Sequence, residues 1–255
     1  MSIVYKTELG STLKDPGLSP HYKWANTEIS WLPLDSRDTF LSNMKNQSSR
    51  EKLISMGWTE TSITYKFNEQ GFRSDPFQGE GAVFLGCSFT QGIGIDWERT
   101  WSYLVARKLG LKCWNLGIGG SSNDTAFRLA YHWIPILKPK FVFYLPTVEY
   151  RFEFITETTL LQFLPSKVYV GNDGYFYDRW LSVRDNSRLN YLKNVAAIKH
   201  ICNENSIPCI TVERKNRFHN PHMDLGRDLL HNGPTWNKDI AGEMLSQLNN
   251  KDVNK

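Results

Sequence analysis

A serine follows the end of an apolar strand in the segment "FLGCSFTQG", residues 84–92. Open parallel sheets bind their ligands at the carboxyl ends of the strands, so Ser88 stands where a reacting group is expected. A serine nucleophile needs a base, an acid that orients the base and an oxyanion hole. In "DLGRDLLHNG", Asp228 precedes His231 by three residues. One tight turn would let this carboxylate hold the Nδ1 proton while Nε2 faces the serine. These residues predict nucleophilic catalysis.

Other interpretations of this strand end are nucleotide binding and simple helix capping. A phosphate-binding P-loop requires a Gly-Lys-Ser/Thr sequence, and none follows Ser88. A dinucleotide site requires G-x-G-x-x-G, but Gly92-Ile93-Gly94 is followed by Ile95, Asp96 and Trp97. Both nucleotide motifs fail on spacing. A serine after a strand also serves as a helix cap, so the nucleophile hypothesis depends on the accompanying motifs.

Further residues compete for, or complete, the predicted site. The glycine-rich segment "NLGIGGSSND", residues 115–124, offers backbone N–H groups for an oxyanion. Asp224 is a second candidate to orient His231, although seven residues require a less local geometry. His219 and His222 have the spacing of a metal pair but lack a third ligand, so we expect solvated loop histidines. No metal site and no cofactor is predicted.

Strands and helices alternate from residue 82 onward. Strands are expected at 82–86, 111–117, 140–146 and 207–213, and helices at 100–110, 123–137, 188–205 and 235–248. This order predicts a parallel sheet with helices on both faces. At 166–180, aromatic-rich sequence flanks Asn172-Asp173-Gly174, which predicts an inserted β-hairpin.

The first 75 residues lack this rhythm, because Pro16, Pro20 and Pro33 interrupt them. They carry Trp24, Trp31 and Trp58, which would be poorly solvated if left free. We therefore expect an irregular but ordered flank that packs on the core.

Composition excludes several classes of protein. The net charge is only +4, from 30 basic and 26 acidic residues without a long run of one sign, so nucleic-acid binding is not expected. No stretch has the length and apolar character of a membrane span, and the first residues lack the apolar core of a signal peptide. We expect a cytoplasmic protein. The four cysteines, without C-x-x-C spacing, are predicted to be buried free thiols.

Three segments together resemble the SGNH, or GDSL-type, hydrolases. Residues 86–90, "GCSFT", resemble the first block of that family, 115–120, "NLGIGG", its second block, and 228–231, "DLLH", its closing D-x-x-H. They occur in the family's order, and the resemblance covers about residues 80–248.

The resemblance implies a three-layer, flavodoxin-like α/β fold and a serine-dependent ester hydrolase. Residues 1–78 would form the flank and 79–255 the hydrolase domain. By position, Ser88 would be the nucleophile, His231 the general base and Asp228 its orienting partner. The Ser88 amide and Gly120 would line the oxyanion hole.

The chain departs from the family pattern in two places. Cys87 stands where the family commonly has Asp. The third block should bring an asparagine after the strand at 140–146, but the sequence there reads "LPTVEYR", which gives Val148 or, one position earlier, Thr147. Asn123 is the candidate replacement donor. Loss of one oxyanion donor costs about a hundred- to a thousand-fold in turnover.

The predicted substrate is a short acyl ester, such as an acetyl ester, on a polar or carbohydrate-like alcohol. Small polar side chains near the strand ends and the aromatic residues Tyr169, Tyr175, Tyr177 and Trp180 are compatible with a sugar-like ligand. Packing in the core or flank is the competing explanation of these aromatics. Glu149 and Arg151 are candidates for an ion pair at the pocket rim. Two other functions stay open: a non-catalytic binding or virion structural protein, and an acyl or sulfuryl transferase on the same frame.

Overall fold

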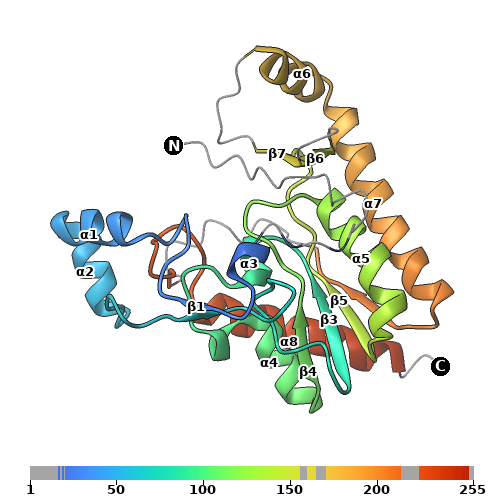
Figure 1. The fold of residues 1–255 in the computed structure, drawn as a ribbon, viewed down its shortest axis with the longest axis horizontal. Coiled ribbons are helices and arrows are strands. Elements are labelled where there is room, and N and C mark those ends of the chain that lie inside the picture. The colour runs from blue at the N-terminus through green and yellow to red at the C-terminus, as the bar shows by residue number, and fades with distance from the viewer. Residues whose placement is uncertain are drawn as a thin grey trace.

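The computed structural model describes residues 17, 19, 21–155, 160–164, 171–213 and 224–252. A four-stranded parallel sheet lies at the centre (Figure 1). Its strands are β3 (Gly81–Leu85), β4 (Lys112–Asn115), β5 (Phe141–Tyr144) and β8 (Cys209–Thr211). The order β4-β3-β5-β8 places the first strand between the second and third, as in flavodoxin-like sheets. The predicted fold class is confirmed.

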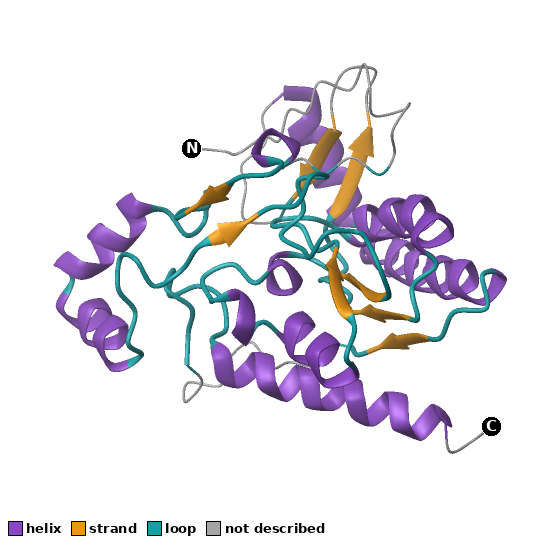
Figure 2. Cartoon of the chain, turned by 60° about the horizontal axis from the view of Figure 1, so that its bottom comes forward, coloured by secondary structure: helices purple, strands orange, loops and turns teal. Residues whose placement is uncertain are grey.

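Helices cover both faces of the sheet. They are α4 (Trp101–Leu109), α5 (Asn123–Leu137), α7 (Arg184–Glu204) and α8 (Pro234–Asp252). Figure 1 shows α5 and α7 on one side of the strands and α4 and α8 on the other, and Figure 2 shows helices on both sides of the sheet from a second direction. All four helices and all four strands were predicted from sequence periodicity.

The central strand β3 is apolar throughout because it faces two helical layers. Successive side chains of a strand point to opposite faces. Val83 and Leu85 therefore join the hydrophobic cluster that includes residues of α5 and α7. Ala82 and Phe84 join the cluster that includes residues of α4 and α8. All four of these strand residues are fully buried. The layers thus hold the strand ends, where the catalytic residues are predicted, in fixed positions.

The N-terminal flank is more regular than the sequence suggested. It contains α1 (Arg37–Lys45) and α2 (Gln47–Ser55), and the short strands β1 (Glu28–Ile29) and β2 (Tyr65–Lys66) pair antiparallel. The prediction of irregular structure is wrong over these two helices. Their only buried residues are Phe40 and Leu53, so the sequence shows almost no helical periodicity.

Helix capping explains where the two flank helices begin. The Ser36 side chain accepts a hydrogen bond from the Thr39 N–H at 3.1 Å, and Asn46 does the same for Ser49 at 3.0 Å. Asn46 also ends α1, so one residue separates the helices. Capping residues and the absence of proline or glycine were the available sequence signals.

The flank shares a hydrophobic cluster with the nucleophile-bearing part of the chain. Leu32, Leu53 and Trp58 pack together with Ile93 and Ile95, which follow Ser88 by a few residues. A division of the chain after residue 78 stays a prediction.

The inserted β-hairpin occurs earlier in the chain than predicted. An antiparallel pair is formed by β6 (Phe152–Ile155) and β7 (Leu160–Phe163), whereas Asn172-Asp173-Gly174 lies in the helix α6 (Gly171–Ser182). Asn and Asp favour the first turn of a helix as well as a tight turn, which explains the error. Residues 165–170, including Tyr169, are outside the described residues.

The aromatic residues of this region divide between packing and exposure. Tyr177 is buried and packs with Phe152 and Phe163, and Trp180 contacts the same cluster. Tyr175 is 67% exposed. Packing therefore accounts for Tyr177 and Trp180, whereas Tyr175 is exposed to solvent, with the Arg179 guanidinium 5.7 Å from its ring centroid.

The four cysteines are buried thiols that form no disulfide among the described residues, as predicted. Among the described helices, none has the length and apolar character needed to cross a membrane.

Candidate active site

Ser88 is the first residue of α3 (Ser88–Gln91), a single helical turn that directly follows β3. The turn between them requires Gly86, which has φ +153°, and an added Cβ would lie 2.2 Å from Thr90 Oγ1 and 2.8 Å from the Leu145 carbonyl oxygen. The first N–H groups of a helix have no intrahelical acceptor. The Ser88 N–H is therefore available to an oxyanion.

The Ser88 side chain is 3% exposed. Its Oγ lies 4.0 Å from Cys87 Sγ, and in the described part of the chain it makes no hydrogen bond to His231. Phe89, which follows Ser88, nevertheless contacts His231, and the two rings pack with centroids 4.9 Å apart. The loop of the predicted nucleophile and that of the predicted base therefore touch.

Asp228 and His231 form a closely held pair. Asp228 Oδ2 lies 2.5 Å from His231 Nδ1, and Asp228 Oδ1 accepts hydrogen bonds from the N–H groups of Leu230 (3.1 Å) and His231 (3.0 Å). The turn between them places Leu229 at φ +54°. Both carboxylate oxygens are thus occupied, and the imidazole is fixed through Nδ1, which leaves Nε2 for another partner.

Asp224, the other candidate, has a different position. Both of its carboxylate oxygens accept hydrogen bonds from the Thr235 N–H at 3.1 Å, at the beginning of α8. Asp224 therefore caps a helix, and Asp228 is the carboxylate that contacts the imidazole.

The loops that carry Ser88 and Asp228 meet at Gly94. The Arg227 N–H donates to the Gly94 carbonyl at 2.7 Å, and a Cβ at Gly94 would lie 2.9 Å from Asp228 Oδ1. Gly94 has φ +80°, which disfavours any other residue. Glycine at this position lets the two backbones approach closely.

The predicted oxyanion residues lie on the loop after β4. Gly120 has φ +74°, and in the described part of the chain its N–H donates to no protein acceptor. The preceding residue is fixed by Gln91, whose Oε1 accepts from the Gly119 N–H at 2.7 Å. Gln91 was not singled out in the sequence, because its partner is far along the chain.

Asn123 is turned toward the loop that follows β5. Its Nδ2 donates to the Thr147 carbonyl at 3.1 Å, and its Oδ1 accepts from the Thr147 N–H at 2.9 Å and the Tyr144 hydroxyl at 2.8 Å. Burial raises the pKa of Tyr144 well above its usual range, so this hydroxyl stays protonated. Asn123 therefore fixes the position at which an asparagine was expected.

Thr147 offers a hydroxyl at that position. It is buried, and its Oγ1 has no hydrogen-bond partner among the described residues. Glu149, two residues on, pairs with Arg188 at 3.5 Å and not with Arg151 as considered from the sequence.

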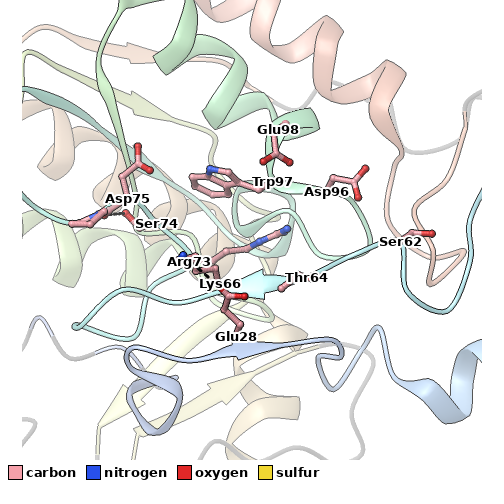
Figure 3. Close-up of a pocket in the computed structure, with 11 residues that line it drawn as sticks. Glu28, Ser62, Thr64, Lys66, Arg73, Ser74, Asp75, Asp96, Trp97 and Glu98 are labelled. Atoms are coloured by element: carbon pink, nitrogen blue, oxygen red, sulfur yellow. Dashed lines mark hydrogen bonds and ion pairs between the residues drawn. The ribbon is translucent and has the colours of Figure 1, made fainter.

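A pocket of about 460 Å³ lies at the junction of the flank and the sheet domain (Figure 3). Its lining is formed by Glu28, Ser62, Thr64, Lys66, Arg73, Ser74, Asp75, Pro76, Asp96, Trp97 and Glu98. Ser88, Asp228 and His231 do not line it. The pocket is therefore a feature separate from the predicted triad.

Arg73 connects this pocket to the end of α3. Figure 3 shows its side chain below the Trp97 ring. The guanidinium donates to the carbonyls of Gln91 (3.2 Å), Gly92 and Ile95 (3.0 Å). Burial lowers the pKa of Arg73 from its usual value. Arg73 thus closes the helical turn that begins at Ser88, and sequence analysis missed it.

No group of three or more His, Cys, Asp and Glu side chains suited to a metal ion occurs among the described residues. His219 and His222 lie outside them.

Comparisons with known proteins give structural likeness only. No protein-family model and no curated protein sequence matches the chain. Among solved structures, a lipase/acylhydrolase from Enterococcus faecalis is 12% identical with a TM-score of 0.37, covering 68% of this chain and 97% of that chain. A GDSL-like lipase from Bacteroides thetaiotaomicron VPI-5482 is 14% identical with a TM-score of 0.31, covering 68% and 89%.

A third structure, a protein assigned to the lipolytic G-D-S-L family from Desulfitobacterium hafniense DCB-2, is 16% identical with a TM-score of 0.32. The match covers 52% of this chain and 58% of that chain, so this chain spans less than two thirds of it. At these identities and TM-scores, the likeness says nothing of what this chain catalyses.

Proposed function

We propose that this chain is a serine-dependent ester hydrolase that uses Ser88, His231 and Asp228. The observation that carries the proposal is the hydrogen bond of 2.5 Å between Asp228 and His231, on a loop that packs against the Ser88 segment. A carboxylate on Nδ1 fixes the tautomer in which Nε2 can accept a proton. This arrangement is the one that a serine nucleophile requires.

In the proposed reaction, Ser88 Oγ attacks the ester carbonyl carbon while His231 Nε2 takes the hydroxyl proton. The carbonyl oxygen becomes an oxyanion, which the N–H groups of Ser88 and Gly120 stabilise. The carbon–oxygen bond to the alcohol then breaks, and His231 returns the proton to the leaving oxygen. Water, deprotonated by His231, attacks the acyl-enzyme and releases the acid and free Ser88.

The proposal requires Ser88 Oγ to turn toward His231, because the described structure contains no hydrogen bond between them. Catalytic hydrogen bonds often become short only in the substrate complex. Thr147 occupies one of the two positions, 147 or 148, at which the third-block asparagine was expected, and its buried Oγ1 has no hydrogen-bond partner among the described residues. The hypothesis that Asn123 is a direct oxyanion donor is weakened, because its amide is hydrogen bonded to the Thr147 backbone.

The proposed substrate is a short acyl ester on a polar or carbohydrate-like alcohol. Ser121, Ser122 and Thr147 are small, polar and buried near the strand ends. Among the aromatic residues considered from the sequence, Tyr175 is the exposed candidate for a contact with a sugar, although the Arg179 guanidinium lies over its ring at 5.7 Å from the centroid.

A series of p-nitrophenyl esters tests both the activity and the chain length. We expect the purified protein to hydrolyse the acetate with a higher kcat/KM than the butyrate or octanoate, because small buried polar groups leave little apolar space for a long acyl chain. Acetylated glycans should be cleaved in preference to triglycerides. A preference for eight carbons or more would contradict the substrate proposal and leave the serine mechanism standing.

A non-catalytic binding or structural protein is the second candidate. The absence of the third-block asparagine and of a Ser88–His231 hydrogen bond favours it. It predicts no turnover of any ester in the series and no reaction of Ser88 with a serine-directed probe. An acyl or sulfuryl transferase would instead require a soluble donor for turnover.

A further inference from the structure

We propose that Asp35 of the N-terminal flank is a positioning residue for the Asp228–His231 pair and acts through Arg227. This inference rests on the proposed function. Arg227 immediately precedes Asp228, and its side chain is 0% exposed. A fully buried guanidinium is strongly destabilising unless it is paired and hydrogen bonded.

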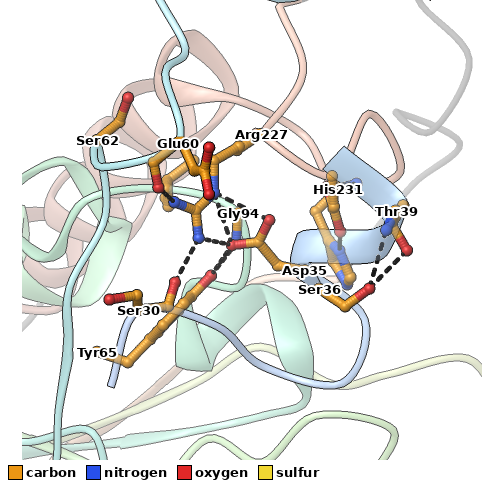
Figure 4. A network of polar contacts seen from close by, with 12 residues as sticks. Ser30, Asp35, Ser36, Thr39, Glu60, Ser62, Tyr65, Gly94, Arg227 and His231 are labelled. Atoms are coloured by element: carbon orange, nitrogen blue, oxygen red, sulfur yellow. Dashed lines mark hydrogen bonds and ion pairs between the residues drawn. The ribbon is translucent and has the colours of Figure 1, made fainter. Parts of the chain in front are cut away.

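Among the described residues, the acceptors of the Arg227 guanidinium belong to the flank (Figure 4). Nε donates to Asp35 Oδ1 at 3.1 Å, and Nη2 donates to Asp35 Oδ2 at 2.7 Å and to the Ser30 carbonyl at 2.6 Å. Nη1 donates to the Glu60 carbonyl at 2.9 Å. The guanidinium also lies 3.8 Å from the centroid of the Trp31 ring. The residue before Asp228 is therefore held by residues 30–60.

The same carboxylate reaches the nucleophile loop through Tyr65. Figure 4 shows Asp35 between Arg227 and Tyr65. The Tyr65 hydroxyl donates to Asp35 Oδ2 at 2.5 Å and accepts from the Gly94 N–H at 2.9 Å. Burial, followed by the charge of Asp35, raises the pKa of Tyr65 well above its usual range, so Tyr65 stays a donor.

These hydrogen bonds form a closed ring of contacts through Arg227, Asp35, Tyr65 and Gly94. The Arg227 N–H donates to the carbonyl of Gly94 at 2.7 Å, and the Gly94 N–H returns to Asp35 through Tyr65. Gly94 belongs to the loop that follows Ser88, and Arg227 immediately precedes Asp228 of the Asp228–His231 pair. One flank carboxylate thus fixes the spacing of the two loops that the proposed reaction needs.

A second contact from the flank holds the start of the loop that carries Asp228 and His231. Trp58 Nε1 donates to the Leu225 carbonyl at 2.8 Å, and the Leu225–Asn232 bridge closes the loop around Asp228. With the flank bonded at Leu225 and at Arg227, a change at Asp35 should loosen the loop at one point without releasing it.

The test uses the full chain with Asp35→Asn, which keeps the side-chain shape and removes the charge. We expect kcat for p-nitrophenyl acetate to fall about 10- to 100-fold, because a displacement of about 1 Å at catalytic groups has an effect of this size. KM should stay near the wild-type value, since no flank residue is proposed to touch substrate. Assays are made where circular dichroism shows the variant to be folded.

A spectroscopic measurement keeps the test independent of turnover. A histidine Nδ1 proton in a short hydrogen bond to a carboxylate gives a proton NMR signal far downfield, and loss of the signal in Asp228→Asn assigns it to His231. We expect Asp35→Asn to shift or broaden this signal. The matched control is Glu28→Gln, which removes the exposed flank ion pair of Glu28 with Lys66 at 3.0 Å and should leave signal and kcat unchanged.

If Asp35→Asn does not fold, Tyr65→Phe removes only the hydroxyl that joins Asp35 to the Gly94 N–H. This variant should change kcat and the NMR signal in the same direction. A folded variant with the wild-type signal overturns the inference, whatever its turnover. If the wild-type protein is inactive, the proposed function is contradicted. The NMR signal of His231 then tests by itself whether Asp35 positions the Asp228–His231 pair.

Discussion

Ser88→Ala is expected to lower kcat for p-nitrophenyl acetate by about 10⁴- to 10⁶-fold, the range found when a triad member is removed. Alanine has no oxygen to attack the carbonyl, so acylation cannot occur. Stability should change little, because among the described residues the Oγ makes only a contact of 4.0 Å with Cys87 Sγ. Steady-state kinetics, with circular dichroism and urea unfolding on the same samples, measure both effects.

Ser102→Ala is the matched control for Ser88→Ala. Ser102 is also a buried serine, but it lies in α4, where its hydroxyl donates to Thr100 Oγ1 at 3.3 Å and accepts from Asn115 Nδ2 at 3.3 Å. We expect kcat within a few-fold of wild type. If Ser88→Ala keeps most of its activity while folded, the nucleophile is a different residue.

Asp228→Asn is expected to lower kcat by about 10⁴-fold while the fold persists. An asparagine oxygen can still accept from the N–H groups of Leu230 and His231, so the turn is kept. The amide carries no charge to stabilise the imidazolium and can favour the wrong tautomer. The same ester assay measures the loss, and the downfield histidine signal should disappear with it.

Asp224→Asn separates the two candidate carboxylates. Its amide oxygen can still accept from the Thr235 N–H that Asp224 now binds at 3.1 Å. We expect wild-type turnover within a few-fold and a small change in unfolding free energy. An active Asp228→Asn protein beside an inactive Asp224→Asn protein would reverse the assignment.

The sheet and its four covering helices were predictable because their signals are local. The central strands β3 and β5 are short apolar runs, and the boundaries of α4 and α5 carry sequence signals: Thr100 and Gly110 cap α4, and Ser122 caps α5. The hydrogen-bonded pair of Asp228 and His231 was predictable for the same reason, since three residues separate them. The spacing also favoured Asp228, three residues from His231, over Asp224, seven residues from it.

The supports of the site could not be predicted, because their partners are distant in the chain. The Asp35–Arg227 bonds join residues separated by 192 positions, and neither residue belongs to a recognisable motif. Arg73 reaches the end of α3 across 18 positions and more. The flank helices were missed because they bury too few side chains to show a period.

The role of Asn123 shows a limit of position-based reasoning. Its place close beyond Gly120 suggested a replacement for the missing oxyanion donor. The structure instead shows it bonded to Thr147 on both sides of the amide, with Tyr144 as a third partner. Which atoms an amide meets depends on the packing of two strand ends, and residue order alone does not contain this information.

The most direct measurement of the central claim is reaction with a fluorophosphonate, followed by mass spectrometry of the peptides. The account predicts one covalent adduct, on Ser88, that forms slowly in Asp228→Asn and not at all in Ser88→Ala. An adduct on another residue, or no adduct on the folded wild-type protein, would contradict the claim that Ser88 is a nucleophile activated by His231.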